Sequence, residues 1–441
     1  MFNRKLPMTK KQKIRIGLII ISIILTIVAT ERIYNMKPEF HVTALDASSY
    51  GIVEAKLTSS EKLEDFEYLC RVLEENYPFF KVNQRLHNID WLGNKRKYKR
   101  LIKNTKNDAE FLLALNKILG DLNNRHVNIF GGYTYKSFYK NFYQYFSKYD
   151  NPYKYMYKYD VFLNPHVRFR YGFDGNVNEL DNVDFLFSDT DLETKILVDN
   201  EVAYINFKSM GGFGVTEEDH KKVKEFLREV QNYKKLIIDI RGNSGGYDSY
   251  WEYIVSLLIN ESINYSYYSF FKDSHINKYK HSPYKLWNSK SINSLDEKIL
   301  SQFPEEVRTD FDYYIKYTIT LNPRAVNVNS SDYIDFKGRV YLLVDSKVFS
   351  SAEKFASFAK DTGFATLVGE TTGGDRVFEE IPLIYLPKSK FVIRFSRELG
   401  INSDGTINME TGTTPHIKVD PAPHEDFTKD KCIQAVIKDS N

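Results

Sequence analysis

The sequence predicts an α/β protein, because short apolar segments alternate with amphipathic segments along the C-terminal half of the chain. Four apolar segments have the length and β-branched character of buried strands: 202–207, 235–240, 340–344 and 365–368. The segments between them carry apolar residues at helical spacing, and they are 216–230, 248–259 and 352–360. This alternation is typical of a parallel sheet covered by helices.

Two stretches nearer the N-terminus predict helices without strands between them. Residues 59–78 and 107–122 each carry one apolar face at helical spacing, and Pro78 ends the first. We therefore divide the chain into six parts: 1–30, a basic flank with a membrane anchor or signal; 31–58, a linker; 59–132, a helical subdomain; 133–191, an aromatic and acidic insert; 192–425, the α/β core with an insertion at 261–335; and 426–441, a tail.

The two inserts have unusual compositions. Residues 133–172 are dense in Tyr, Phe and Lys. They fit an extended β insert whose lysine stems cover apolar surface, and equally an aromatic substrate groove or a membrane-facing surface. Residues 261–335 are polar and aromatic, with helices expected at 294–303 and 305–317. A β-hairpin is expected after them, with strands at 379–386 and 391–395.

The N-terminus has the pattern of a targeting segment. Residues 1–15 hold six basic side chains and no acidic one, and residues 16–29 are apolar apart from three small residues. This pattern indicates a cleaved signal peptide or a single membrane anchor. We favour the anchor, because Val-Ala-Thr at 28–30 is a poor cleavage site. The basic flank then stays cytoplasmic and the rest lies outside the cell membrane; with cleavage, the protein is secreted.

Charge and motif content exclude some partners. Beyond residue 15 the chain has 55 basic and 58 acidic residues, which does not suggest a nucleic-acid surface. The loop RGNSGG at 241–246 follows a strand, but it matches neither common nucleotide-binding glycine spacing. We expect no cofactor and no metal. The two cysteines, Cys70 and Cys432, fit one disulfide or two buried thiols, and their spacing does not decide between these.

Ser350 is the first candidate catalytic residue. It lies between an apolar strand and an amphipathic helix, where helix-start N–H groups favour negative charge. The alternative is structural, because Ser350 with Glu353 also fits a helix capping box. His126 is a second candidate, in the loop after the predicted helix at 107–122. An isolated loop histidine is more often solvated or packed than catalytic.

Several separated segments together resemble the C-terminal-processing (tail-specific) serine peptidase family. They are LLALNKILGDLNNRHV, VAYINFKSM, KLIIDIRGNSGGY and VYLLVDSKVFSSAEKFASFAKDTGFATLVGETTGG, and METGTTPHIKVDP is similar to the family's closing segment. The resemblance spans about residues 59–421. It implies a crotonase-like β/α core with an N-terminal helical piece, and a serine peptidase acting on polypeptides.

The resemblance also implies a set of catalytic residues. One branch of the family uses a Ser/Lys dyad with the lysine in T-F-G-K-G, but here that segment reads TTGGD and places Asp375 at the lysine position. No segment has the length and character of a PDZ domain. The chain more closely resembles the branch of the tricorn-protease core and the retinoid-binding repeats. Its base histidine and late glutamate correspond to His126 and Glu410.

Chemistry supports this assignment and adds an oxyanion hole. A serine hydroxyl needs a base, which a neutral imidazole can be, and a carboxylate such as Glu410 could fix its tautomer or orient the substrate. We expect the N–H of Ser351 and an N–H of Gly245 or Gly246 to bind the oxyanion. Two alternatives stay open: a catalytically inactive binding protein on the same fold, and an esterase-type acyl hydrolase.

Overall fold

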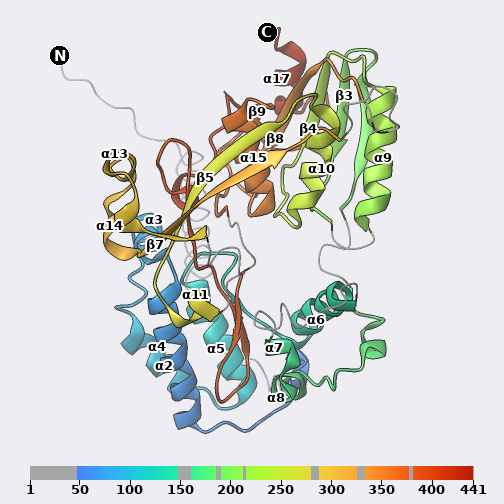
Figure 1. Cartoon of the computed structure of the whole chain (residues 1–441). Helices are drawn as coiled ribbons and strands as arrows, with labels where there is room; N and C mark the ends of the chain where they lie inside the picture. The colour runs from blue at the N-terminus through green and yellow to red at the C-terminus, as the bar shows by residue number, and fades with distance from the viewer. Residues whose placement is uncertain are drawn as a thin grey trace, which may run out of the picture. The chain divides into compact units, whose positions relative to one another are not determined.

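A six-stranded sheet forms the framework of the C-terminal half (Figure 1). The computed structural model describes residues 47–147, 160–184, 190–211, 215–279, 288–324, 332, 334–376 and 381–440. The strand order is β13-β9-β8-β4-β3-β2, and all neighbours are parallel except the antiparallel edge pair β2 and β3. The strands are β2 (Glu193–Val198), β3 (Val202–Asn206), β4 (Lys235–Asp239), β8 (Arg339–Val344), β9 (Thr366–Gly369) and β13 (Ile417–Lys418). The predicted mixed α/β fold is confirmed, and the loops after β4, β8 and β9 leave the sheet at one edge.

Helices cover both faces of this sheet, because its strands alternate the directions of their apolar side chains. On one face, a buried cluster joins the sheet to α9 (Val215–Glu229), α10 (Asp248–Leu258) and α15 (Ser351–Thr362). On the other face, α17 (Lys431–Lys438) packs Cys432, Ile433 and Val436 against the sheet. Cys432 and Cys70 are both buried free thiols, so the disulfide alternative is wrong.

The insertion after α10 contains a long antiparallel pair that the sequence reading missed. Strands β5 (Ile263–Phe271) and β7 (Tyr313–Leu321) pair over nine residues, within a sheet ordered β12-β5-β7-β6. The other elements here are α11 (His275–Tyr279), β6 (Lys290–Ser291), η4 (Ile292–Ser294), α13 (Glu297–Leu300), α14 (Glu305–Asp310) and β12 (Leu399–Ile401). The helix expected at 305–317 therefore ends at Asp310. Aromatic and β-branched residues then continue the chain as a strand, which is the conformation they favour.

The N-terminal part is helical, and its aromatic segment is helical too. Its elements are η1 (Ala47–Tyr50), α2 (Ser59–Asn76), α3 (Phe80–His87), α4 (Lys95–Lys103), α5 (Asp108–Gly120), α6 (Gly132–Ser147), α7 (Asp160–Leu163), α8 (Pro165–Arg170) and η3 (Val177–Leu180). The extended reading of 133–172 is wrong where it is described. Tyr135, Phe138, Tyr139 and Phe142 recur at helical spacing, and this face packs in the core.

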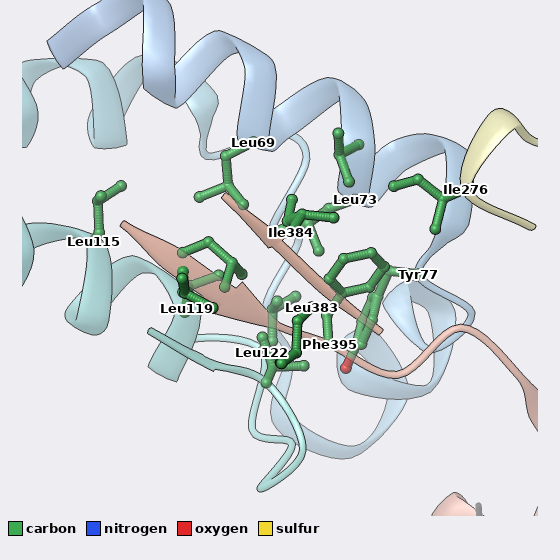
Figure 2. Packing of buried hydrophobic residues seen from close by; sticks show 14 of the residues in the cluster. Leu69, Leu73, Tyr77, Leu115, Leu119, Leu122, Ile276, Leu383, Ile384 and Phe395 are labelled. Carbon is green, nitrogen blue, oxygen red and sulfur yellow. The ribbon is translucent and has the colours of Figure 1, made fainter. Parts of the chain in front are cut away.

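A small third sheet joins this helical part to the C-terminal hairpin. The expected hairpin is present as β10 (Leu383–Tyr385) and β11 (Val392–Arg394), and β11 also pairs with β1 (Asn128–Ile129). Figure 2 shows Leu383, Ile384 and Phe395 of this segment packed among residues of α2 and α5. His126 comes just before β1, so this sheet sets the place of the loop that carries it.

The N-terminal targeting segment lies outside the described residues. The expected anchor at 16–29 and most of the linker at 31–58 belong to the part that the structure does not describe. Within the described ranges, no helix is both long enough and apolar enough to cross a membrane. The division of the chain into six parts stays a prediction.

Candidate active site

Ser350 occupies a strained turn between β8 and α15. Its backbone has φ 59° and ψ −122°, a conformation that costs a non-glycine residue free energy and is found at functional turns. The side chain of Ser350 makes no capping hydrogen bond to the helix. The Glu353 carboxylate is also engaged elsewhere, because its Oε1 accepts hydrogen bonds from Asn408 and Thr413. The capping-box reading of Ser350 is therefore wrong.

His126 lies between the serine and a carboxylate. Its Nε2 is 3.0 Å from Ser350 Oγ, and its Nδ1 is 2.7 Å from Asp375 Oδ2. Because an ionised carboxylate can only accept, the proton on the ring belongs on Nδ1, and Nε2 is free to accept from the serine. The imidazole packs on the Phe349 ring, with centroids 4.5 Å apart. The geometry is that of a nucleophile, a base and an orienting carboxylate in series.

Burial sets the protonation state of this histidine. His126 is 3% exposed and Asp375 is 1% exposed. Burial lowers the pKa of His126 from its usual 6.5, while the nearby negative charge of Asp375 opposes that shift and only partly cancels it. The imidazole is therefore neutral near pH 7, which is the form that can accept a proton.

The loop after β9 holds Asp375 in place through backbone contacts. Gly373 N–H donates to Val348 O at 2.8 Å, which ties this loop to the turn before Ser350. Asp375 itself has φ 57°, in the left-handed region. The next residue, Arg376, donates its backbone N–H to Asn408 Oδ1 at 2.9 Å. The strained aspartate is thus held from both sides.

Glu410 does not contact His126. It lies in α16 (Asn408–Thr411), and its carboxylate accepts two hydrogen bonds from Arg85, at 2.8 and 2.5 Å. Arg85 also binds Glu306 at 2.6 Å. The prediction that Glu410 lies beside the imidazole is corrected. Asp375 contacts the imidazole instead, and Arg85 holds Glu410 in an ion pair.

Of the predicted oxyanion donors, Ser351 and Gly245 lie directly beside Ser350. Gly245 is so close that an added Cβ would lie 2.8 Å from Ser351 N and 3.0 Å from Ser350 Cβ. However, the N–H of Gly245 already donates to Asn243 Oδ1 at 2.8 Å, which argues against it as a donor to substrate. No hydrogen bond of the Ser351 or Gly246 N–H groups is found within the described part of the chain. These two amides are the better candidates.

Asp375 is the site residue that the sequence reading did not assign. In the sequence it stands only as a replacement for the lysine of the Ser/Lys branch. The available signal was its position: a carboxylate in the loop that follows a parallel strand adjacent to β8. Among the residues that the structure describes, no group of three His, Cys, Asp or Glu side chains could hold a metal ion.

Comparisons with known proteins match the chain to two peptidase domain families. Residues 201–419 match Peptidase family S41, and residues 59–120 match the Tricorn protease C1 domain. No curated protein matches the chain.

Solved structures share the fold. A "putative peptidase" from Parabacteroides merdae ATCC 43184 is 21% identical with a TM-score of 0.52, over 85% of this chain and 95% of that one. Mature CPAF is 11% identical with a TM-score of 0.51, over 82% of this chain and 92% of that one. CPAF complexed with lactacystin is 12% identical with a TM-score of 0.51, over 82% and 94% of the two chains.

Proposed function

This chain belongs to peptidase family S41, and we propose that it hydrolyses polypeptides with Ser350 as nucleophile, His126 as general base and Asp375 as the carboxylate that orients His126. One observation carries the assignment. Ser350 Oγ, both ring nitrogens of His126 and Asp375 Oδ2 form one chain of contacts at 3.0 and 2.7 Å. Such a chain is the arrangement that activates a serine for acyl transfer.

The proposed reaction follows from these contacts. His126 Nε2 accepts the hydroxyl proton as Ser350 Oγ attacks the scissile carbonyl. The imidazolium then gives that proton to the leaving amine, and water reverses the sequence on the acyl-enzyme. Ser351 N–H and Gly246 N–H stabilise the oxyanion. Removing one such donor typically costs about 2.7–4 kcal/mol of transition-state stabilisation.

The orienting carboxylate is reassigned from Glu410 to Asp375. Asp375 cannot act as the family's lysine base, because it has no amine and a carboxylate is normally ionised near neutrality. As an anion next to Nδ1 it instead favours the tautomer that leaves Nε2 unprotonated. Glu410 keeps a structural role in this proposal, in an ion pair that links α16 to α3.

Two further parts of the proposal rest on the sequence. We propose that residues 16–29 anchor the protein in the cell membrane, with the peptidase on the outer side; if they are cleaved, the protein is secreted. We also propose that residues 192–425 form a crotonase-like core, since the loops after its parallel strands meet around Ser350.

A serine-reactive fluorophosphonate tests this function and separates it from its alternatives. We expect the full chain to be labelled on Ser350, identified by mass spectrometry of the labelled peptide, and Ser350→Ala to remain unlabelled. An inactive binding protein would not be labelled. An esterase would be labelled but would hydrolyse ester substrates and leave unfolded polypeptides intact.

A further inference from the structure

Only one of the two carboxylate oxygens of Asp375 has hydrogen-bond partners. Its Oδ2 contacts His126 Nδ1 at 2.7 Å and accepts from Ser396 Oγ at 3.4 Å. Its Oδ1 is fully buried and makes no hydrogen bond within the described part of the chain. An unsatisfied oxygen of a buried carboxylate carries a desolvation penalty, so a native structure normally supplies it with a donor.

The hydroxyl of Tyr77 is a buried donor without a hydrogen-bond partner in the described part of the chain. It is the residue after α2, its side chain is 0% exposed, and its hydroxyl also makes no hydrogen bond within the described ranges. Burial raises the pKa of Tyr77 well above its usual value, and the charge of Asp375 raises it further, whereas the Asn124 side chain, which lies close to the hydroxyl, opposes the shift. The hydroxyl therefore lies within the electrostatic reach of the Asp375 carboxylate.

Tyr77 packs in the same buried cluster as residues of the segments that lead to the site. In Figure 2, the Tyr77 ring crosses the buried cluster and its hydroxyl lies on the side of Phe395 and Leu122. Phe395 is followed by Ser396, which binds Asp375, and Leu122 lies four residues before His126. Tyr77 thus belongs to the same buried cluster as the residues that precede Ser396 and the His126 loop.

We propose that Tyr77 is a positioning residue, whose hydroxyl donates to Asp375 Oδ1 through one buried water. The inference rests on the proposed function, because it assigns a support to that same triad. Donors on both oxygens hold the carboxylate plane against the imidazole and share its negative charge. Without the Tyr77 donor, more of that charge acts on His126 and the protonated imidazole becomes more favourable.

The test is Tyr77→Phe in the full chain, compared with Tyr135→Phe. Tyr135 lies in the same buried cluster, and its hydroxyl donates to Val161 O rather than to the triad. For Tyr77→Phe we expect kcat to fall about tenfold with KM within about twofold, the effect of one hydrogen bond to a charged group. The midpoint of the acid limb of kcat/KM should rise by roughly half a pH unit or more. Tyr135→Phe should match the wild type in both.

A second measurement does not depend on turnover. NMR titration of labelled histidines in the full chain should give His126 a higher pKa in Tyr77→Phe than in the wild type and in Tyr135→Phe. Unchanged kcat and an unchanged His126 pKa in Tyr77→Phe would overturn the proposal. Equal losses of kcat in both variants without a change in that pKa would also overturn it, because they indicate lost packing alone.

These outcomes are distinct from failure of the proposed function. If Ser350→Ala retained wild-type hydrolysis, the serine mechanism would be wrong whatever Tyr77→Phe did. If Ser350→Ala were inactive and Tyr77→Phe matched the wild type, the serine mechanism would stand and only the role of Tyr77 would be lost.

Discussion

Asp375 and Glu410 lie in two neighbouring segments, and only one of them contacts the imidazole. The two segments are tied together, because Arg376 N–H donates to Asn408 Oδ1. Asp375 is 1% exposed and contacts His126, whereas the Glu410 side chain is 24% exposed and pairs with Arg85. The position of a carboxylate in the sequence is therefore not enough to show that it orients the imidazole. Its backbone conformation and its nearest cation decide what it can orient.

The largest expected effects come from Ser350 and His126, which are catalytic whether Asp375 or Glu410 orients the imidazole. Ser350→Ala and His126→Ala should each lower kcat by on the order of 10⁴- to 10⁶-fold, because the nucleophile and its base act as a unit. The double variant should be no worse than either single variant. Steady-state kinetics on a peptide substrate measures this, with circular dichroism to confirm that each variant is folded. A His126→Ala variant with near-normal kcat would refute the triad.

Asp375→Asn is the variant that best distinguishes the role of Asp375 from that of Glu410. The amide preserves the shape of the side chain but can donate to Nδ1, so it favours the tautomer whose Nε2 carries the proton. The analogous change in Ser-His-Asp peptidases costs about 10⁴-fold in kcat, and we expect a loss of that order. A loss below about tenfold would show that Asp375 does not orient the base.

The pH profile tests the burial of His126. Only the neutral imidazole accepts the serine proton, so kcat/KM rises with pH through the pKa of His126 in the free enzyme. Since burial lowers that pKa, the midpoint should lie below the usual 6.5, with a plateau above it. A midpoint clearly above 6.5 would contradict the account and would fit a lysine base better.

The same shift affects stability, with a defined sign. Below about pH 6.5 the unfolded chain binds a proton at this histidine more readily than the folded chain does. The contribution of His126 to the free energy of unfolding therefore decreases as the pH falls from 6.5 through its lowered pKa. Denaturant titrations of the wild type and His126→Ala should show a weaker pH dependence in the variant over this window.

Glu410→Gln should have the smallest effect. It removes a negative charge from an ion pair whose Arg85 side chain is 41% exposed, and such pairs contribute about 0–1 kcal/mol to stability. We expect kcat within about threefold of the wild type. A loss approaching that of Asp375→Asn would restore Glu410 to the catalytic set.

The regular part of the fold was predictable because it depends on local pattern. Strands β3, β4, β8 and β9 are short apolar runs buried on both faces, and the helices between them have one apolar side. The aromatic segment in α6 was misread because Tyr and Phe favour strands intrinsically, while their helical spacing decided the outcome. Strands β5 and β7 were missed because they stabilise each other across 41 intervening residues.

The site was predictable in part for a similar reason. Ser350 and His126 stand in recognisable segments, so position along the chain was sufficient to select them. The choice between Asp375 and Glu410 depended on long-range contacts, namely the Arg85 pair and the close approach of the loop after β9 to His126. Neither contact leaves a periodic signal in the sequence.

The most direct test of the central claim is the proton on Nδ1 of His126. In the full-length protein, proton NMR should show a low-field resonance from this proton, because it is held between a ring nitrogen and a buried carboxylate. We predict that the resonance is lost or moves strongly upfield in Asp375→Asn and is unchanged in Glu410→Gln. The reverse pattern, with the resonance kept in Asp375→Asn and lost in Glu410→Gln, would contradict the account.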